Sequence, residues 1–147
     1  MSAELFSDEW AAAWAAEINA SDSYRVKASK WEGALVLVIE PDPALGIEAQ
    51  RAVLMDLFRG QCRAARVATA DDLGQAPYVL SGPAAVWDQI LYGQLEPAAA
   101  VTMGLLSLAK GSLRDLVPFI PAAHQLLLAA GRVDTVLPEG WERPETA

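Results

Sequence analysis

The sequence predicts an α+β fold, in which a mostly antiparallel sheet of five or six strands is covered on one face by helices. Strand-like segments follow one another from residue 24 to residue 68 without a helical pattern between them, so we expect them to pair as hairpins. Helical patterns gather in the second half of the chain, which places them together on one side of the sheet. One further helical pattern opens the chain.

The opening helix is expected within residues 5–21. Ser7 can accept a hydrogen bond from the free amides of the first turn, and the two acidic residues after it suit the positive end of the helix dipole. Large apolar residues recur every four positions and form one stripe, namely Phe6, Trp10, Trp14 and Ile18. Such a stripe is typical of a core-facing side, and it is equally compatible with the wall of a ligand cavity.

Strands are expected next. Residues 24–29 alternate apolar and polar side chains, which predicts a half-exposed strand, and residues 32–33 are expected to form a turn. The continuous apolar run at residues 35–39 fits a central strand that is covered on both faces. Residues 49–68 predict a hairpin with its turn at Arg59 and Gly60.

The second half begins after a polar connector at residues 69–77 and a short strand at residues 78–82. A helix is expected from Pro83 to Gly93, with Val86, Trp87, Ile90 and Leu91 on its buried side. A shorter helix follows up to Gly104, and then a strand. Two prolines, Pro118 and Pro121, are expected to bend the chain before a last helix at residues 121–130.

Composition limits the class of protein. The chain has 147 residues, enough for one domain with a substantial core, and a net charge of −8. An acidic chain without a basic stripe is not expected to bind nucleic acid. No apolar run reaches the ~20 residues that a membrane helix needs, and the acidic N-terminus is unlike a signal peptide. We therefore expect a cytoplasmic protein without an integral membrane segment.

Chemically reactive side chains are few and scattered. Cys62 is the only cysteine and His124 the only histidine, so no disulfide or zinc site can be assembled within the chain. Ser81, Ser107 and Ser112 have His124 as their only candidate base, and no acid is placed to orient it. We expect no enzyme activity, no metal and no cofactor.

A spaced series of small and turn-forming residues follows the helix that ends at Gly93. The series consists of Gly93, Glu96, Pro97, Ala100 and Gly104. Its spacing resembles that of the sterol carrier protein 2 family of lipid-binding domains, and the order of elements is similar over about residues 5–132. The chain departs from the family at Leu105, where a lysine is common, and at Ser112, where an acidic residue or asparagine is usual.

This resemblance implies a lipid-binding domain at residues 1–132, followed by a tail or arm at residues 133–147. It also implies an internal cavity that binds or transfers a fatty acid, an acyl-CoA or another lipid without catalysis. The sequence supports a cavity because small side chains and proline bends above a sheet pack imperfectly, and an apolar void stays dry and accepts apolar ligands. An ordinary filled core is the alternative that these residues leave open.

The cavity walls are expected to come from large apolar side chains of the hairpin, the two central helices and the last strand. These are Met55, Trp87, Ile90, Leu91, Val101, Met103, Leu106 and Leu108. A mobile lid is expected from the proline-bent segment and the last helix, with Leu113, Leu116, Val117, Phe119, Ile120 and Leu127. The alternative function is a protein–protein or dimerisation module without a lipid ligand, in which Trp141 of the tail would suit a homodimer contact.

Overall fold

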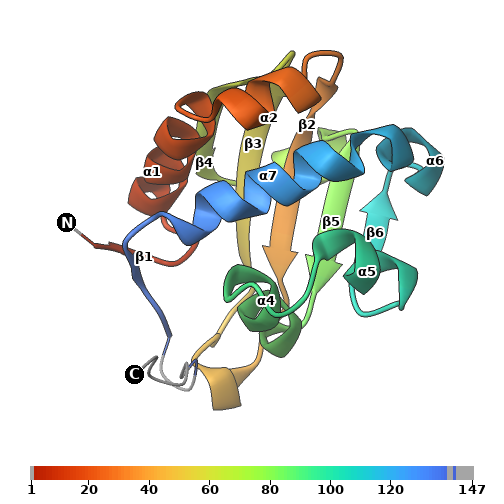
Figure 1. Ribbon diagram of the computed structural model, residues 1–147. Helices are drawn as coiled ribbons and strands as arrows, with labels where there is room; N and C mark the ends of the chain where they lie inside the picture. The colour runs from red at the N-terminus through yellow and green to blue at the C-terminus, as the bar shows by residue number, and fades with distance from the viewer. Residues whose placement is uncertain (1, 139–140, 142–147) are drawn as a thin grey trace.

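The computed structural model describes residues 2–138 and Trp141, and a five-stranded sheet lies at its centre (Figure 1). The strand order is β4-β3-β2-β5-β6. The strands are β2 (Glu32–Ile39), β3 (Arg51–Phe58), β4 (Gln61–Val67), β5 (Tyr78–Gly82) and β6 (Ser107–Lys110). Within this sheet β2 and β5 pair in parallel, and the other neighbours are antiparallel. The predicted α+β class is confirmed.

Strand β2 is the central strand and is covered on both faces, as its apolar run predicts. Leu37 and Ile39 belong to the larger core cluster, whereas Val36 and Val38 belong to a smaller cluster on the opposite face. Alternate side chains of a strand point to opposite faces. A strand that is buried on both faces therefore needs the unbroken apolar run seen here.

Helices cover the larger cluster, and the longest of them in the second half crosses the middle of the sheet (Figure 1). These helices are α1 (Asp8–Asn19), α2 (Asp22–Lys27), α4 (Ala84–Leu91), α5 (Pro97–Thr102), α6 (Leu113–Leu116), the 3-10 turn η2 (Val117–Phe119) and α7 (Ile120–Gly131). Helix α7 is the one that crosses the sheet. The predicted helical layer on one face is thus present.

The predicted strand at residues 24–29 is wrong, because this segment forms the helix α2. Ser21 caps the helix by accepting a hydrogen bond from the backbone N–H of Tyr24 at 3.1 Å. Tyr24 and Ala28 are both buried, and they lie four residues apart on one helical face. Val26, between them, is 74% exposed. The buried residues are therefore spaced as in a helix, although the alternation of apolar and polar residues over six positions also fits a strand.

Two connections also differ from the prediction. Glu32 and Gly33 do not form a turn but begin β2, where they pair with Phe58 and Leu57 of β3. The polar connector at residues 69–77 contains the short helix α3 (Ala70–Gln75), which Thr69 and Asp72 cap reciprocally. Helix α3 packs on the sheet face opposite the other helices, since Leu73 lies against the smaller core cluster.

The hairpin and the second half of the chain agree with the prediction. The β3–β4 turn falls at Arg59 and Gly60, both with positive φ. Helix α4 buries Val86, Trp87, Ile90 and Leu91, as expected from its spacing. Gly93 and Gly104 follow the ends of α4 and α5, and both have a positive φ, which a glycine adopts at no steric cost.

The chain after residue 132 returns to the domain as far as the structure describes it. Thr135–Val136 (β7) pairs in parallel with Ala3–Glu4 (β1), and the indole of Trp10 donates a hydrogen bond to Thr135 Oγ1 at 2.8 Å. The Trp141 indole donates to the carbonyl of Leu45, at the end of the 3-10 turn η1 (Pro43–Leu45), at 2.8 Å. Trp141 is only 3% exposed, so its side chain packs against other residues of the same chain. The rest of the tail, residues 139–140 and 142–147, lies outside the described residues, and a homodimer stays a prediction.

Candidate ligand-binding cavity

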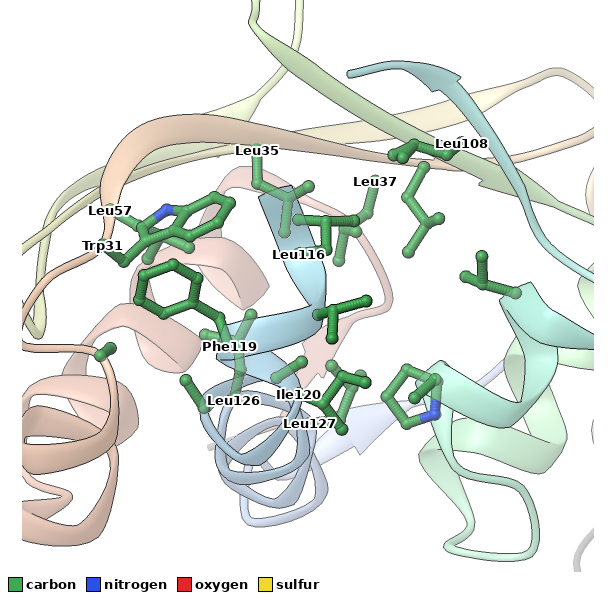
Figure 2. A pocket seen from close by; sticks show the side chains of 18 of the residues that line it. Trp31, Leu35, Leu37, Leu57, Leu108, Leu116, Phe119, Ile120, Leu126 and Leu127 are labelled. Carbon is green, nitrogen blue, oxygen red and sulfur yellow. The ribbon is translucent and has the colours of Figure 1, made fainter. Parts of the chain in front are cut away.

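A cavity of about 150 Å³ lies between α7 and the inner face of the sheet. Its floor is made of side chains from four neighbouring strands, so it runs across the sheet: Leu57 of β3, Leu35 and Leu37 of β2, Leu80 of β5 and Leu108 of β6. Figure 2 shows Leu35, Leu37 and Leu108 on the sheet side, with Ile120 and Leu127 on the opposite side of the cavity.

The other walls come from six helical segments and the residue that precedes β2. Around α2 they are Tyr24, Ala28 and Trp31; from α4, Trp87; from α5, Pro97, Ala98, Val101 and Thr102; from α6 and η2, Leu113, Leu116, Val117 and Phe119; and from α7, Ile120, Ala122, Ala123, Leu126 and Leu127. The rings of Trp31 and Phe119 meet edge to face with centroids 4.9 Å apart, which ties η2 to the start of β2 (Figure 2). The cavity therefore lies among these helical segments, and each of them contributes side chains to its wall.

The polar groups in the wall are few, and most are used within the protein. The indole of Trp31 donates to Gly33 O at 2.9 Å, the indole of Trp87 donates to Val38 O at 2.8 Å, and Thr102 Oγ1 donates to Ala98 O at 2.9 Å. No acidic side chain, lysine, arginine or histidine belongs to the lining that the structure describes. Such a space disfavours water and favours apolar groups.

The two ends of the cavity differ in how far their side chains are buried. Leu113, Val117 and Ile120 line the cavity and are 46%, 53% and 39% exposed, so the mouth lies at α6, η2 and the start of α7. At the α2 end, Tyr24 and Ala28 line the same cavity and are almost fully buried. The cavity therefore has a closed end at α2 and an open side under the proline-bent segment.

Most of the side chains predicted to bind the ligand come together in this cavity. Those in the lining are Trp87, Val101, Leu108, Leu113, Leu116, Val117, Phe119, Ile120 and Leu127. The structure places the other predicted wall residues elsewhere. Met55, Ile90, Leu91 and Leu106 are packed in the core, and Met103 is 66% exposed on the surface. Contact of any of these residues with a ligand stays a prediction.

The lining also contains residues that the sequence analysis did not predict to bind the ligand. They are Tyr24, Ala28, Trp31, Leu35, Leu37, Leu57, Leu80, Pro97, Ala98, Thr102, Ala122, Ala123 and Leu126. Tyr24 and Ala28 were assigned to a strand, and a four-residue spacing behind the capping Ser21 is the signal that identifies their helix. The strand leucines lie on the inner face by alternation, but only the helix above them decides which ones border the cavity.

The two potentially reactive side chains Cys62 and His124 do not belong to the cavity lining. Burial, with a smaller contribution from Asp56, raises the pKa of Cys62 to about 11, so the thiol is neutral and unreactive at neutral pH. The side chain of His124 is half exposed, and its Nδ1 lies 3.8 Å from a carboxylate oxygen of Glu96. Within the described residues no cluster of metal-ligating side chains is found, and none of the helices there is both long and apolar enough to cross a membrane.

Fold and cavity together define a class of small α+β domains that enclose an apolar space beneath a layer of helices. Comparison with solved structures identifies the family within this class. A crystal structure of sterol carrier protein 2 is 40% identical, with a TM-score of 0.80, over 88% of this chain and 99% of its own. The chain therefore belongs to the sterol carrier protein 2 family, as the spacing of Gly93, Glu96 and Pro97 predicts.

Two further solved structures support the same fold. A conserved hypothetical protein from Thermus thermophilus, described as possibly a sterol carrier protein, is 38% identical with a TM-score of 0.81, over 95% of this chain and 97% of its own. Palmitated SCP2L2 from Aedes aegypti shares the fold at 15% identity and a TM-score of 0.50, over 76% of this chain and 92% of its own. No family model and no curated protein sequence matches the chain.

Proposed function

We propose that this protein binds or transfers an apolar ligand in the cavity beneath α7, without catalysing a reaction on it. The observation that supports this most directly is the lining itself, in which apolar side chains from four strands and several helices surround about 150 Å³ of space. Fatty acids, acyl-CoA and other lipids are the ligand classes that such a wall suits. We place this function in the cytoplasm, where a free and enclosed thiol such as Cys62 stays reduced.

The size of the cavity indicates how such a ligand enters. An engineered protein cavity of similar volume holds one benzene molecule, so about six carbons fit here without rearrangement. Burial gains about 0.8 kcal/mol per methylene, and association costs several kcal/mol, so six carbons alone bind weakly. A longer chain needs more space, and the exposed segment of α6 and η2 is the part of the wall that can yield it.

The identity of a natural ligand is tested by extraction. Protein purified under native conditions is extracted with organic solvent, and the extract is analysed by mass spectrometry. Displacement of a fluorescent fatty acid is then measured, with palmitate as the first competitor because of the palmitated Aedes aegypti relative. Absence of any co-purified lipid, together with no binding of the fluorescent fatty acid, contradicts the proposal.

A pair of neighbouring alanines in α5 tests whether binding takes place in this cavity. Ala98 lines the cavity, whereas Ala99 does not, and both are partly exposed. We expect Ala98→Trp to weaken binding of the fluorescent fatty acid at least tenfold, because the indole fills part of the space that the alkyl chain needs. Ala99→Trp is the control and is expected to bind within about twofold of the native protein. Equal affinities of the two variants would place the site elsewhere.

A further inference from the structure

One polar group in the cavity wall is not used by the protein. The lining contains four side chains with hydrogen-bonding groups, and three of them, Trp31, Trp87 and Thr102, donate to backbone carbonyls. The fourth is Tyr24. Among the residues that the structure describes, its backbone N–H bonds to Ser21, but no residue pairs with its hydroxyl group.

The position of Tyr24 makes this unpaired hydroxyl significant. Tyr24 is 2% exposed and lies at the closed end of the cavity, with Ala28 as its neighbour on α2. Its phenol oxygen is nevertheless within reach of a water-sized molecule, since it is not one of the fully sealed unpaired atoms. A hydroxyl group enclosed in this way gains from an acceptor, so a ligand that supplies one here binds more tightly than a ligand of the same size that does not.

We propose that the Tyr24 hydroxyl donates a hydrogen bond to an uncharged oxygen at the inserted end of the ligand. The ligand class is then a neutral lipid with a hydroxyl or carbonyl oxygen, rather than a plain hydrocarbon or an inserted carboxylate. This inference rests on the proposed function, because it assumes that the cavity beneath α7 holds the ligand. It adds which end of the ligand enters first and which chemical group that end carries.

The charge of the wall explains why the oxygen is uncharged. An ionised carboxylate that leaves water needs a cation or several hydrogen bonds, and no cationic side chain lines the described cavity. Burial raises the pKa of Tyr24 above its usual value, with a smaller contribution from Cys62, so the phenol remains a proton donor. An ionised fatty acid would therefore keep its carboxylate at the mouth, away from Tyr24.

The test compares 1-octanol with octane as competitors of a bound fluorescent fatty acid. For each variant, the affinity for 1-octanol is divided by the affinity for octane. Comparison of this ratio between two variants removes the difference in hydration between the two ligands. We expect Tyr24→Phe to weaken 1-octanol about fivefold, as for loss of one hydrogen bond, and to leave octane within twofold. Tyr78→Phe is the matched control, because Tyr78 lies outside the cavity lining and its hydroxyl donates to Asp115 at 3.3 Å.

Each outcome decides between distinct conclusions. An equal change for both ligands in Tyr24→Phe overturns the inference and leaves Tyr24 as part of the apolar wall, and so does no change for either ligand. Failure of the native protein to bind the fluorescent fatty acid at all contradicts the proposed function itself, whereas failure of 1-octanol to displace it overturns the inference alone. If Tyr24→Phe does not fold, the native protein is examined by NMR with 1-octanol labelled at its oxygen-bearing methylene. A nuclear Overhauser effect to the Tyr24 ring is expected, and an effect only to residues at the mouth overturns the inference.

Discussion

At the scale of single residues, burial decides the chemistry of the few reactive side chains. Cys62 is 5% exposed on β4. The side chain of Asn19 in α1 forms two hydrogen bonds with the backbone of Cys62: Nδ2 donates to Cys62 O, and Oδ1 accepts from Cys62 N–H. The thiol itself donates to Ala64 O at 3.4 Å. A neutral, enclosed thiol of this kind packs as a small apolar group.

The raised pKa of Cys62 predicts a dependence of stability on alkaline pH. The unfolded thiol ionises near pH 9, whereas the folded thiol ionises only near pH 11. The free energy of unfolding is therefore unaffected by this group below pH 9 and falls between pH 9 and pH 11, by on the order of 2 kcal/mol. Urea unfolding of the native protein and of Cys62→Ala across this range measures the difference. Parallel curves for the two proteins would contradict the prediction.

At the scale of elements, a tight contact joins the β3–β4 hairpin to the helix α2. Gly60, with φ +86°, lies in the hairpin turn, and a side chain there would come within 2.6 Å of the backbone oxygen of Arg25. This contact holds the segment that carries Tyr24 against the end of the sheet. The turn thus positions the closed end of the cavity as well as reversing the chain.

Replacement of Gly60 tests the importance of this contact. Gly93 provides a matched control, because its φ is +85° and no atom would meet an added side chain within 4 Å. We expect Gly93→Ala to cost about 1 kcal/mol of unfolding free energy, from backbone strain alone. Gly60→Ala is expected to cost about 1–3 kcal/mol more, because the added methyl also meets the backbone of α2. Chemical denaturation measures both, and equal losses would show that the α2 contact is not restrictive.

At the scale of the whole molecule, a well-buried sheet adjoins a less buried helical segment. The short strands β1 and β7 pair with each other, and the buried Trp141 donates a hydrogen bond to Leu45 of η1. In contrast, α6 and η2 expose Leu113 and Val117 although both line the cavity. Segments with few buried contacts open at low free energy, which makes this one suited to admit a ligand.

Ligand binding is therefore expected to change exchange rates unevenly across the molecule. With 1-octanol at saturation, amide hydrogen exchange should slow at least several-fold in residues 113–119, because the alkyl chain fills the space beneath them. At 100 times the dissociation constant, the ligand also stabilises the folded state by about 2.7 kcal/mol, which raises the thermal midpoint. Mass spectrometry of exchanged peptides measures the first effect. Uniform slowing without a larger change at residues 113–119 would contradict the role of this segment as the entrance.

The sequence predicts most elements because their signals are local. Alternation identifies the hairpin at Arg59 and Gly60, a continuous apolar run identifies the central strand, and glycine and proline spacing identifies α4 and α5. The segment at residues 24–29 shows the limit of such signals, because six alternating residues fit both periods. The capping Ser21, and the burial of Tyr24 and Ala28 beside exposed Val26, show that the helical period is the right one.

The sequence by itself determined the α+β class and the resemblance to the family, and it predicted an apolar wall, since these depend on residue order and residue type. Tertiary structure decided which apolar side chains border the cavity. Met55 and Leu57 both lie on the inner face of β3, but of the two only Leu57 borders the cavity. Other core side chains cover Met55, whereas the space above Leu57 stays open. The unpaired hydroxyl of Tyr24 likewise depends on contacts between distant segments, which no local pattern contains.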